Sequence, residues 1–364
     1  MTAPTLLQAF ARQESWCREL SPFSARVLQR SRLWLQADAA PLAAFEALAD
    51  DPLAAAVALR WLGALHHLAL RGLQPWASLW PPCPGTAPGI AAASDPALDA
   101  AVRAAWHEQS VLVQAALAGP PQTNEVQRSA ALLPGLLHVA AHTGLPLVLL
   151  EMGASAGLNL WCDRYRHEHA DAQGQPCWAW GETPSLLTLR SEWRGNIPTE
   201  AGTNLRLARR AGCDTHPIDL QQPDEKLRLA SFIWPDQPER LARLRAATGA
   251  AAAWMAQERV AVQCSSAAAF VAAQLQALQP GHVTVLMHSV VWQYIAPQEQ
   301  AALHATVQAA ARAATTNAPL AWLRLEPMAL DEPVQLRCQI WPGGEDRLLA
   351  QAHPHGAWVE WLAA

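Results

Sequence analysis

The sequence predicts an α/β protein in which an N-terminal all-helical region precedes a sheet of about seven strands, mostly parallel and completed by an antiparallel C-terminal hairpin. Three observations predict this class. Hydrophobic residues make up 51% of the 364 residues and charged residues only 16%, which is ample material for a packed core. The first 120 residues repeat Ala and Leu at the spacing of helices. Beyond residue 145, short apolar runs alternate with helical stretches, as in parallel sheets.

The N-terminal domain is expected to span residues 1–120. Helical spacing is found in Leu6–Leu20, Ser24–Leu35, Pro41–Leu48, Pro52–Leu70 and Asp95–Leu117. Several prolines between Pro75 and Gly89 must interrupt any helix there. Thr123 is a suitable N-cap for a further helix over 124–142, which leads into the second domain.

The second domain, residues 121–364, is expected to hold the sheet. Strands are predicted at Leu147–Met152, Leu205–Arg209, Val260–Cys264, His282–His288 and Leu320–Leu325. Helices are predicted from about Ala156 and over Pro238–Gln257, Ala267–Leu278 and Pro297–Ala314. The closing antiparallel strands are predicted at Val334–Ile340, Arg347–Ala352 and Trp358–Trp361.

Residues 167–200 fit this alternation poorly. They hold three of the seventeen tryptophans among Gly and Pro residues. We interpret them as an insertion, either a lid or hairpin over the cleft or a surface excursion that packs on its own aromatic side chains.

Composition and charge exclude several classes. The net charge is −5, the pI is near 6.2, and no basic run occurs, which argues against nucleic-acid binding. Seven scattered cysteines without a CxxC pair argue against a disulfide framework and favour the cytoplasm. The first residues lack the pattern of a secretory signal, and no apolar stretch is long enough for a membrane span. The expected partner is therefore a small-molecule substrate.

The most informative stretch is residues 147–160, LVLLEMGASAGLNL, in which a buried strand is followed by an acid, small residues and a predicted helix start. Small side chains at Gly153, Ser155 and Gly157 let a ligand approach the backbone closely. Open α/β sheets bind ligands at this position, outside the carboxyl ends of the strands.

Two cofactor chemistries compete for this turn. A dinucleotide site requires a third glycine where Leu158 stands, so a nicotinamide cofactor is disfavoured. S-adenosylmethionine carries no phosphate and needs room for an amino-carboxylate and a ribose. Glu151, two residues before the first glycine, would face the cationic part of that cofactor.

Residues 153–157, GASAG, also match the G-x-S-x-G nucleophile elbow, in which Ser155 would be the nucleophile of a serine hydrolase. Asp331 and His353 or His355 would complete the triad. Glu151 argues against this alternative, because a buried carboxylate beside the nucleophile has no role in hydrolysis. A further alternative is a helix-capping turn in a fold that has lost its ligand, with Ser155 as N-cap. A ligand-binding protein of methyltransferase-like fold without catalysis is also left open.

The turn resembles a bacterial family known as domain of unknown function 2332. So do the segments Gln122–Leu136, Arg210–Leu220, Leu227–Ala247 and His288–Tyr294. The turn and the predicted strand order are also similar to the Rossmann-like sheet of class I S-adenosylmethionine-dependent methyltransferases. The chain departs from that pattern at Ser155, where glycine is usual, and at residues 263–266, QCSS, which lack the acid that often contacts adenine.

The methyltransferase resemblance implies an acid after the second strand that accepts hydrogen bonds from the ribose. Asp214 and Asp219 are the candidates, and we expect Asp219 to have this role, although either could cap a turn. Asn124, Glu125 and Arg128 begin the helix before the glycine turn. We expect them to reach the cofactor or the substrate, unless Glu125 only complements the helix dipole.

His288, Trp292 and Tyr294 follow the predicted strand beside the turn. His288 is a candidate general base, and Trp292 or Tyr294 could stack on a planar substrate. A buried histidine with two packing aromatics is the alternative. No metal site is expected, because the HxH pairs at 167–169 and 353–355 lack convergent ligands.

The sequence thus leads to an S-adenosylmethionine-dependent methyltransferase that acts on a small molecule. The expected catalytic residues are His288 and Tyr294. The expected cofactor-binding residues are Asn124, Glu151, Gly153, Ser155, Gly157, Asn159 and Asp219, and the expected substrate-binding residues are Glu125, Arg128 and Trp292.

Overall fold

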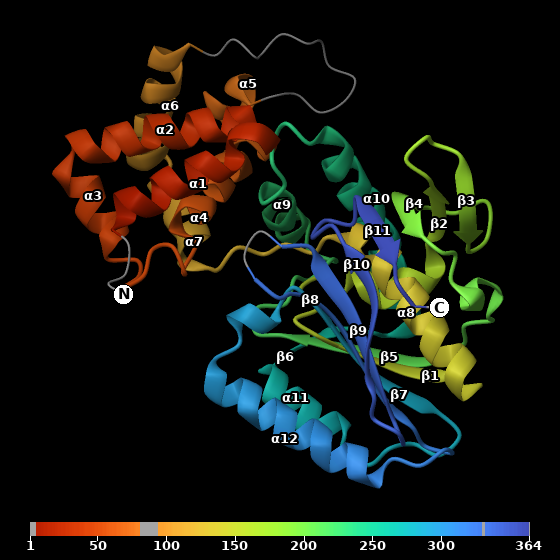
Figure 1. The fold of residues 1–364 in the computed structure, drawn as a ribbon. Coiled ribbons are helices and arrows are strands. Elements are labelled where there is room, and N and C mark those ends of the chain that lie inside the picture. Colours follow the sequence, from red (N-terminus) through yellow and green to blue (C-terminus); the bar gives the residue numbers. More distant parts are fainter. Residues whose placement is uncertain (1–4, 81–93, 330–331, 364) are drawn as a thin grey trace. The chain divides into compact units, whose positions relative to one another are not determined.

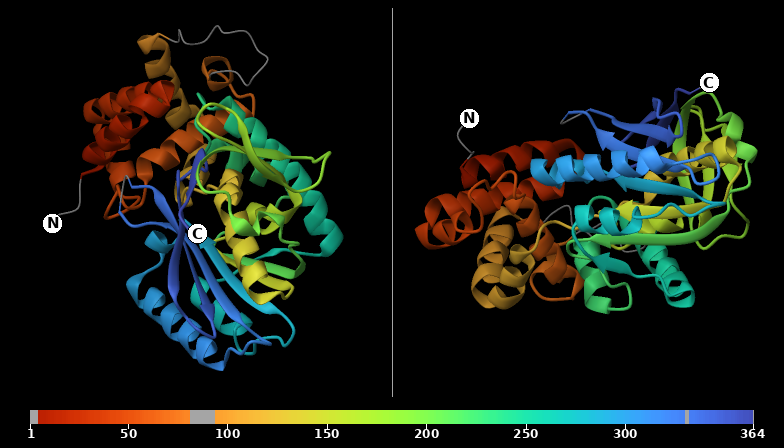
Figure 2. Two further views of the ribbon diagram at one scale, coloured as in Figure 1. Left: turned by 45° about the vertical axis from the view of Figure 1, so that its right-hand side comes forward. Right: turned by 90° about the horizontal axis from the view of Figure 1, so that it is seen from below.

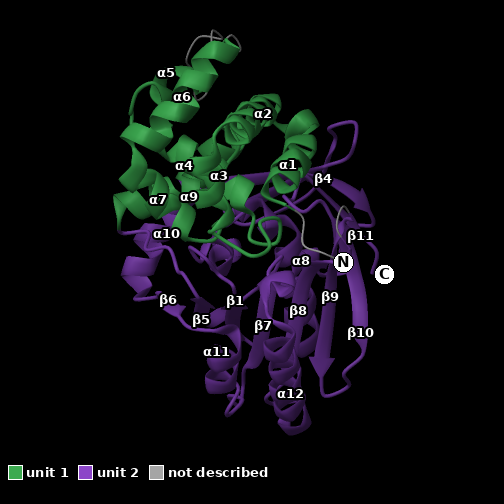
Figure 3. Cartoon of the chain, turned by 90° about the vertical axis from the view of Figure 1, so that its left-hand side faces the viewer, with its two compact units in different colours: residues 1–123, 222–245 green, residues 124–221, 246–364 purple. Residues whose placement is uncertain are grey.

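The computed structural model describes residues 5–80, 94–329 and 332–363, and the chain divides into two compact units (Figure 3). Unit 1 consists of residues 1–123 and 222–245, and unit 2 consists of residues 124–221 and 246–364. The sequence places a boundary near residue 120 but gives no sign that residues 222–245 belong to the same unit as the N-terminal helices.

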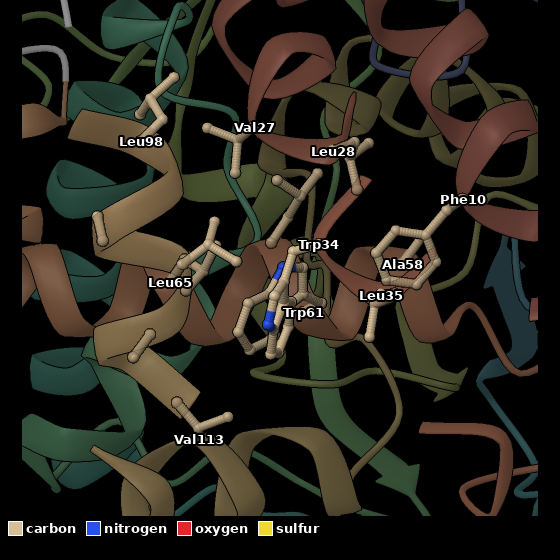
Figure 4. Close-up of a cluster of buried hydrophobic side chains, with 14 of the residues drawn as sticks. Phe10, Val27, Leu28, Trp34, Leu35, Ala58, Trp61, Leu65, Leu98 and Val113 are labelled. Atoms are coloured by element: carbon tan, nitrogen blue, oxygen red, sulfur yellow. The ribbon is translucent and has the colours of Figure 1, made fainter. Parts of the chain in front are cut away.

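Unit 1 is helical, and none of its described residues belongs to a strand (its N-terminal segment is red to orange in Figure 2). Its elements are α1 (Leu6–Leu20), α2 (Pro22–Ala37), α3 (Ala39–Glu46), α4 (Val57–Leu70), α5 (Trp76–Leu79), α6 (Asp95–Glu108), α7 (Ser110–Ala118), α9 (Pro223–Ser231) and the start of α10 (Pro238–Glu258). Trp34 and Trp61 stack at its centre, with their ring centroids 5.9 Å apart (Figure 4).

The second segment of unit 1 packs into the first. The Nδ1 atom of buried His66 lies 3.0 Å from the carbonyl oxygen of Ser231. The Asp236 carboxylate accepts a hydrogen bond from the N–H of Phe23 at 3.0 Å. A Cβ atom on Gly63 would lie 2.7 Å from the Phe232 ring, so α4 meets this segment closely.

Unit 2 is built on one sheet of eleven strands in the order β3-β2-β4-β11-β10-β9-β8-β7-β1-β5-β6, so the expectation of about seven was wrong. The strands are β1 (Leu147–Met152), β2 (Arg166–Ala170), β3 (Pro176–Trp180), β4 (Thr188–Gly195), β5 (Leu207–Asp214), β6 (Val262–Cys264), β7 (Val283–Ser289), β8 (Leu320–Pro327), β9 (Val334–Trp341), β10 (Asp346–Ala352) and β11 (Trp358–Trp361). Most neighbouring pairs are parallel, and β8 to β11 form the expected antiparallel series.

The additional strands come from the tryptophan-rich stretch at 167–200. It forms β2, β3 and β4, which extend the sheet because β4 pairs in parallel with the C-terminal strand β11. His167 and His169 point inward from β2 and are buried, and His169 stacks on Trp178 at 4.5 Å. Alternation of buried and half-buried residues along β2 is the pattern of a strand with one covered face.

Helices cover both faces of the sheet (Figure 1). The helices α11 (Ala267–Gln274) and α12 (Pro297–Ala313) pack on the face that carries Val148 and Leu150. On the opposite face, Gly135 of α8 (Ser129–Thr143) lies against Leu323 and Leu336.

The expected helix from about Ala156 is wrong. A short 3-10 helix, η2 (Leu158–Arg164), stands there, because Gly157 has φ +73° and Trp161 has non-helical dihedral angles. The chain then enters β2 without an α-helix between β1 and β5. No helix in the described ranges is both long and apolar enough to cross a membrane.

Candidate functional site

The strand order reverses between β1 and β7. In the sheet, β5 and β6 lie on one side of β1, and β7 and β8 lie on the other. All these strands are parallel, so their carboxyl ends meet at one edge. In open α/β sheets the crevice at such a reversal is where ligands bind. Glu151, Asp214, His288 and Glu326 all lie at these strand ends.

The turn after β1 is bent sharply and tied to β5. Gly153, Ser155 and Gly157 all have positive φ angles, between +53° and +73°. The N–H of Ala154 donates to the Cys213 carbonyl at 2.9 Å. Ser155 donates its N–H to Asp214 Oδ2, also at 2.9 Å. Asp214, at the end of β5, therefore fixes the conformation of the turn.

The glycines of the turn are packed against neighbouring side chains. A Cβ atom on Gly153 would lie 2.4 Å from Cγ2 of Val291, and one on Gly157 would lie 2.6 Å from Cε of Met255. These positions therefore require glycine for both dihedral angle and space. The turn leaves no room for a ligand in those two directions.

Glu151 is the least satisfied acid of this edge. Its carboxyl is buried, and Oε2 has no hydrogen-bond partner among the residues that the structure describes. Burial raises the pKa of Glu151 well above its usual value, the Arg128 charge lowers it, and the Asp214 charge raises it further. A buried carboxyl in this state binds a proton or a cation, because desolvation penalises the lone charge.

Polar side chains from α8, from η2 and from the segment before η1 form hydrogen bonds beside the turn. The Oδ1 atom of Asn124 accepts the N–H of Leu158 at 2.9 Å, which caps η2. Ser129 donates its hydroxyl to Asn159 Oδ1 at 2.9 Å. The Nδ2 group of Asn159 is buried and finds no partner within the described part of the chain. A carboxyl oxygen and an amide NH₂ thus remain available.

Arg128 and Glu125 have structural contacts as well. Arg128 donates from Nε to the Pro354 carbonyl at 2.9 Å and from its terminal nitrogen to the Ser289 carbonyl at 3.3 Å. It therefore connects the last residue of β7 to the loop that follows β10. Glu125 accepts the N–H of Gln127 at 3.2 Å and caps the short helix η1 (Val126–Arg128).

His288 faces the other side of the sheet. In register, Met152 lies opposite His288, whereas Glu151 lies opposite Met287. Since side chains alternate between the two faces, His288 and Glu151 point to opposite faces. The structure therefore does not bring these two residues together.

A carboxylate accompanies His288 on its own face. The Nδ1 atom of His288 lies 2.6 Å from Oε1 of Glu326, at the end of β8. Trp292 of η4 (Trp292–Tyr294) stacks on the imidazole with 5.4 Å between centroids. Tyr294 lies on the surface with 73% of its area exposed, two residues beyond the ring that stacks on His288.

Asp219 lies five residues beyond the end of β5, next to Ile218, whose N–H donates to the Ser155 carbonyl at 3.1 Å. Asp219 is exposed, and its carboxylate accepts the N–H of Gln221 at 2.8 Å. Asp214 is the last residue of β5, and its Oδ1 atom accepts the N–H of His216 at 2.8 Å. The strand predicted at Leu205–Arg209 ended before either acid, whereas β5 continues to Asp214.

Sequence reasoning missed Glu326. A signal was present, since Glu326 ends the strand after that of His288, and adjacent parallel strands end at one edge. The Oε1 atom of Glu326 also accepts the N–H of Val291 at 3.0 Å. Glu326 therefore holds the imidazole and the segment that packs against Gly153 at the same time.

Other chemistries receive little support. No group of three His, Cys, Asp or Glu side chains suited to a metal ion occurs among the described residues. Nδ1 of His288 bonds to Glu326, and its Nε2 has no partner in the described ranges, so His288 does not bond to Ser155. His353 accepts the N–H of His355 at its Nδ1 atom, and Asp331 lies outside the described residues.

Comparison with known proteins gives one match. A family model described as "Uncharacterized protein conserved in bacteria (DUF2332)" matches residues 7–361. No curated protein and no solved structure matches the chain.

Proposed function

The chain belongs to DUF2332, a family of uncharacterized proteins conserved in bacteria, and for this member we propose S-adenosylmethionine-dependent methyl transfer to a small molecule. The observation that carries the proposal is the buried Glu151 carboxyl, whose Oε2 atom has no partner among the described residues. It stands at the carboxyl end of the central strand, beside the reversal of strand order.

The residues fit the charged part of this cofactor. Its methionine moiety carries an ammonium and a carboxylate, and its sulfonium carries a further positive charge. Glu151 would accept from the ammonium, and the free NH₂ of Asn159 would donate to the carboxylate. Asp214, half-buried at the end of β5, would accept from the ribose hydroxyls. The end of β6 carries Cys264 and no acid, so adenine recognition would need other groups.

When bound, the cofactor supplies an activated methyl group that an acceptor atom displaces in line. The chain would then contribute orientation and exclusion of water. Glu151 of β1 and Asn159 of η2 would hold the methionine part of the cofactor. The glycine turn, which Asp214 holds through the N–H of Ser155, would keep the end of β1 in place. Preorganised binding of this kind lowers the entropic cost of the displacement.

Calorimetric titration with S-adenosylmethionine and its demethylated product tests the proposal. We expect both to bind the wild-type chain, and Glu151→Gln to weaken both by about 10- to 100-fold, as expected for loss of one charge-assisted hydrogen bond. Glu182→Gln removes an exposed carboxylate of unit 2 and should leave binding unchanged. Absence of binding to the wild type, or equal binding by Glu151→Gln, would contradict the proposal.

One observation favours a second candidate, a serine hydrolase. Ser155 has φ +53° in the turn after β1, and a strained dihedral angle at the nucleophile is typical of the G-x-S-x-G elbow. A fluorophosphonate probe should then label the chain at Ser155 and fail to label Ser155→Ala. Absence of labelling in the wild type rejects this candidate.

A further inference from the structure

A second polar cluster lies on the α12-facing side of the sheet, where His288, Glu326 and Trp322 come from β7 and β8. His288 is 1% exposed and Trp322 is 2% exposed. Three of their polar atoms have no hydrogen-bond partner among the described residues, namely Nε2 of His288, Nε1 of Trp322 and Oε2 of Glu326. Buried polar atoms are nearly always paired in folded proteins, so three together mark a place that a ligand completes.

The hydrogen bonds of Glu326 fix the proton of the imidazole. Oε1 accepts the backbone N–H of Val291 and lies 2.6 Å from Nδ1 of His288. A carboxylate oxygen is an acceptor, so Nδ1 carries the proton. In the neutral ring Nε2 then presents a lone pair. The orientation of this base is set by its partner carboxylate, as in other carboxylate–histidine pairs.

The surroundings indicate the kind of ligand. Two indole rings pack near His288, at centroid distances of 5.4 Å for Trp292 and 6.0 Å for Trp322, and His304 packs on both indoles. Arg324, the nearby cation, is paired with Asp346. The Glu326 charge disfavours an anion, and aromatic walls favour a planar ring.

We propose that His288 and Glu326 form a proton-accepting dyad for a neutral, planar compound that bears a hydroxyl group, such as a phenol. A hydroxyl can accept from the Trp322 N–H and donate to His288 Nε2, which satisfies the two unpaired ring nitrogens. In the transfer, the O–H bond breaks, its electron pair stays on oxygen, and the proton forms a bond to Nε2. The resulting imidazolium is stabilised by Glu326, which acts as a positioning residue.

This inference goes beyond the proposed function, because His288 and Glu151 lie on opposite faces of the sheet.

The first experiment is ¹⁵N-NMR of the full chain with labelled histidine, with the His288 signals assigned from His288→Gln. We expect the Nδ1-protonated tautomer in the wild type. Glu326→Gln keeps an acceptor oxygen and should retain that tautomer, whereas Glu326→Leu should shift the proton to Nε2. An Nε2-protonated His288 in the wild type would overturn the proposal, whether or not the Leu variant folds.

The second experiment adds phenol to the labelled chain, with benzene as the matched compound without a hydroxyl. Phenol should move the Nε2 signal of His288, and benzene should not. Equal responses to the two compounds would overturn the ligand class. Neither experiment contains S-adenosylmethionine, so failure here is distinct from failure of the methyltransferase proposal.

Discussion

At the scale of single residues, the main feature of the chain is a set of polar groups buried at a cost. Glu151, Asn159 and His288 each keep an atom without a partner among the described residues. A buried polar atom left unpaired costs about 1–3 kcal/mol of folding free energy. Groups retained at such a cost are candidates for function, because activity and stability commonly oppose each other at binding sites.

Glu151→Gln should therefore stabilise the protein while it weakens cofactor binding. Because burial raises the pKa of Glu151, the folded chain holds a proton that the unfolded chain has released, and wild-type stability falls as pH rises above about 4.5. Glutamine has no such penalty. Urea unfolding followed by circular dichroism should show a stability gain of roughly 1–3 kcal/mol at pH 8 and less at pH 5. A variant less stable than wild type at pH 8 would contradict the assignment of a desolvated carboxyl.

Two buried histidines should make the folding stability of the protein sensitive to acid. Burial lowers the pKa of His167 to about 4 and that of His169 to about 3. Both stay neutral in the folded chain while the unfolded chain takes up protons below about pH 6.5, so stability should fall by ~1.4 kcal/mol per pH unit for each histidine as pH drops from 6.5 toward 4. His169→Phe keeps a ring against Trp178 and should remove one of these contributions. In the same urea series, His216→Gln, at an exposed position, should leave the pH slope unchanged. A slope equal to wild type in His169→Phe would contradict the prediction.

At the scale of elements, the spacing of apolar residues predicted most helices and strands. Where it failed, the cause was the backbone conformation of single residues. The segments Leu6–Leu20 and Leu147–Met152 were predicted with their observed bounds. The helix expected after the glycine turn failed, because Gly157 and Trp161 leave helical dihedral angles, which apolar spacing does not report. Of the candidate site, the sequence identified Glu151 and His288. It could not assign them to opposite faces, since that depends on the register between β1 and β7.

The contact between the glycine turn and the segment after β7 gives a prediction at this scale. Gly153→Ala places a methyl group on the Val291 side chain and a side chain at φ +63°, and it strains the Val291 N–H bond to Glu326. We expect a loss of roughly 2–5 kcal/mol, the sum of left-handed strain and overpacking. Gly281→Ala is the matched control, because Gly281 has φ +75° and no heavy atom lies within 4 Å of the position that its methyl group would take. Its loss should be about 1–2 kcal/mol. Equal losses in urea unfolding would mean that the Val291 contact has no effect.

At the scale of the whole molecule, the chain builds its helical unit from two separate segments. Residues 222–245 lie between β5 and β6 in sequence, yet they belong to unit 1. The spacing of apolar residues predicts that a helix forms and which of its faces is buried. It does not predict which of the two units the helix packs into. The helix Pro238–Gln257 was predicted well, whereas its division at residue 245 between two units was not.

Unit 1 should need both of its segments in order to fold. Residues 1–123 alone lack Phe232, which fills the space beside Gly63, and Ser231, whose carbonyl contacts buried His66. Their removal would expose the apolar surface of α4 and leave a buried imidazole nitrogen without its partner, each at a cost of about 1–3 kcal/mol or more. We expect a 1–123 fragment to unfold without a cooperative transition, and a fragment that joins 1–123 to 222–245 through a long Gly/Ser linker to unfold cooperatively in urea. Because a helical unit of this size has a stability of only about 5–15 kcal/mol, the missing contacts should be decisive. Cooperative unfolding of 1–123 by itself would show that the second segment is dispensable for the core.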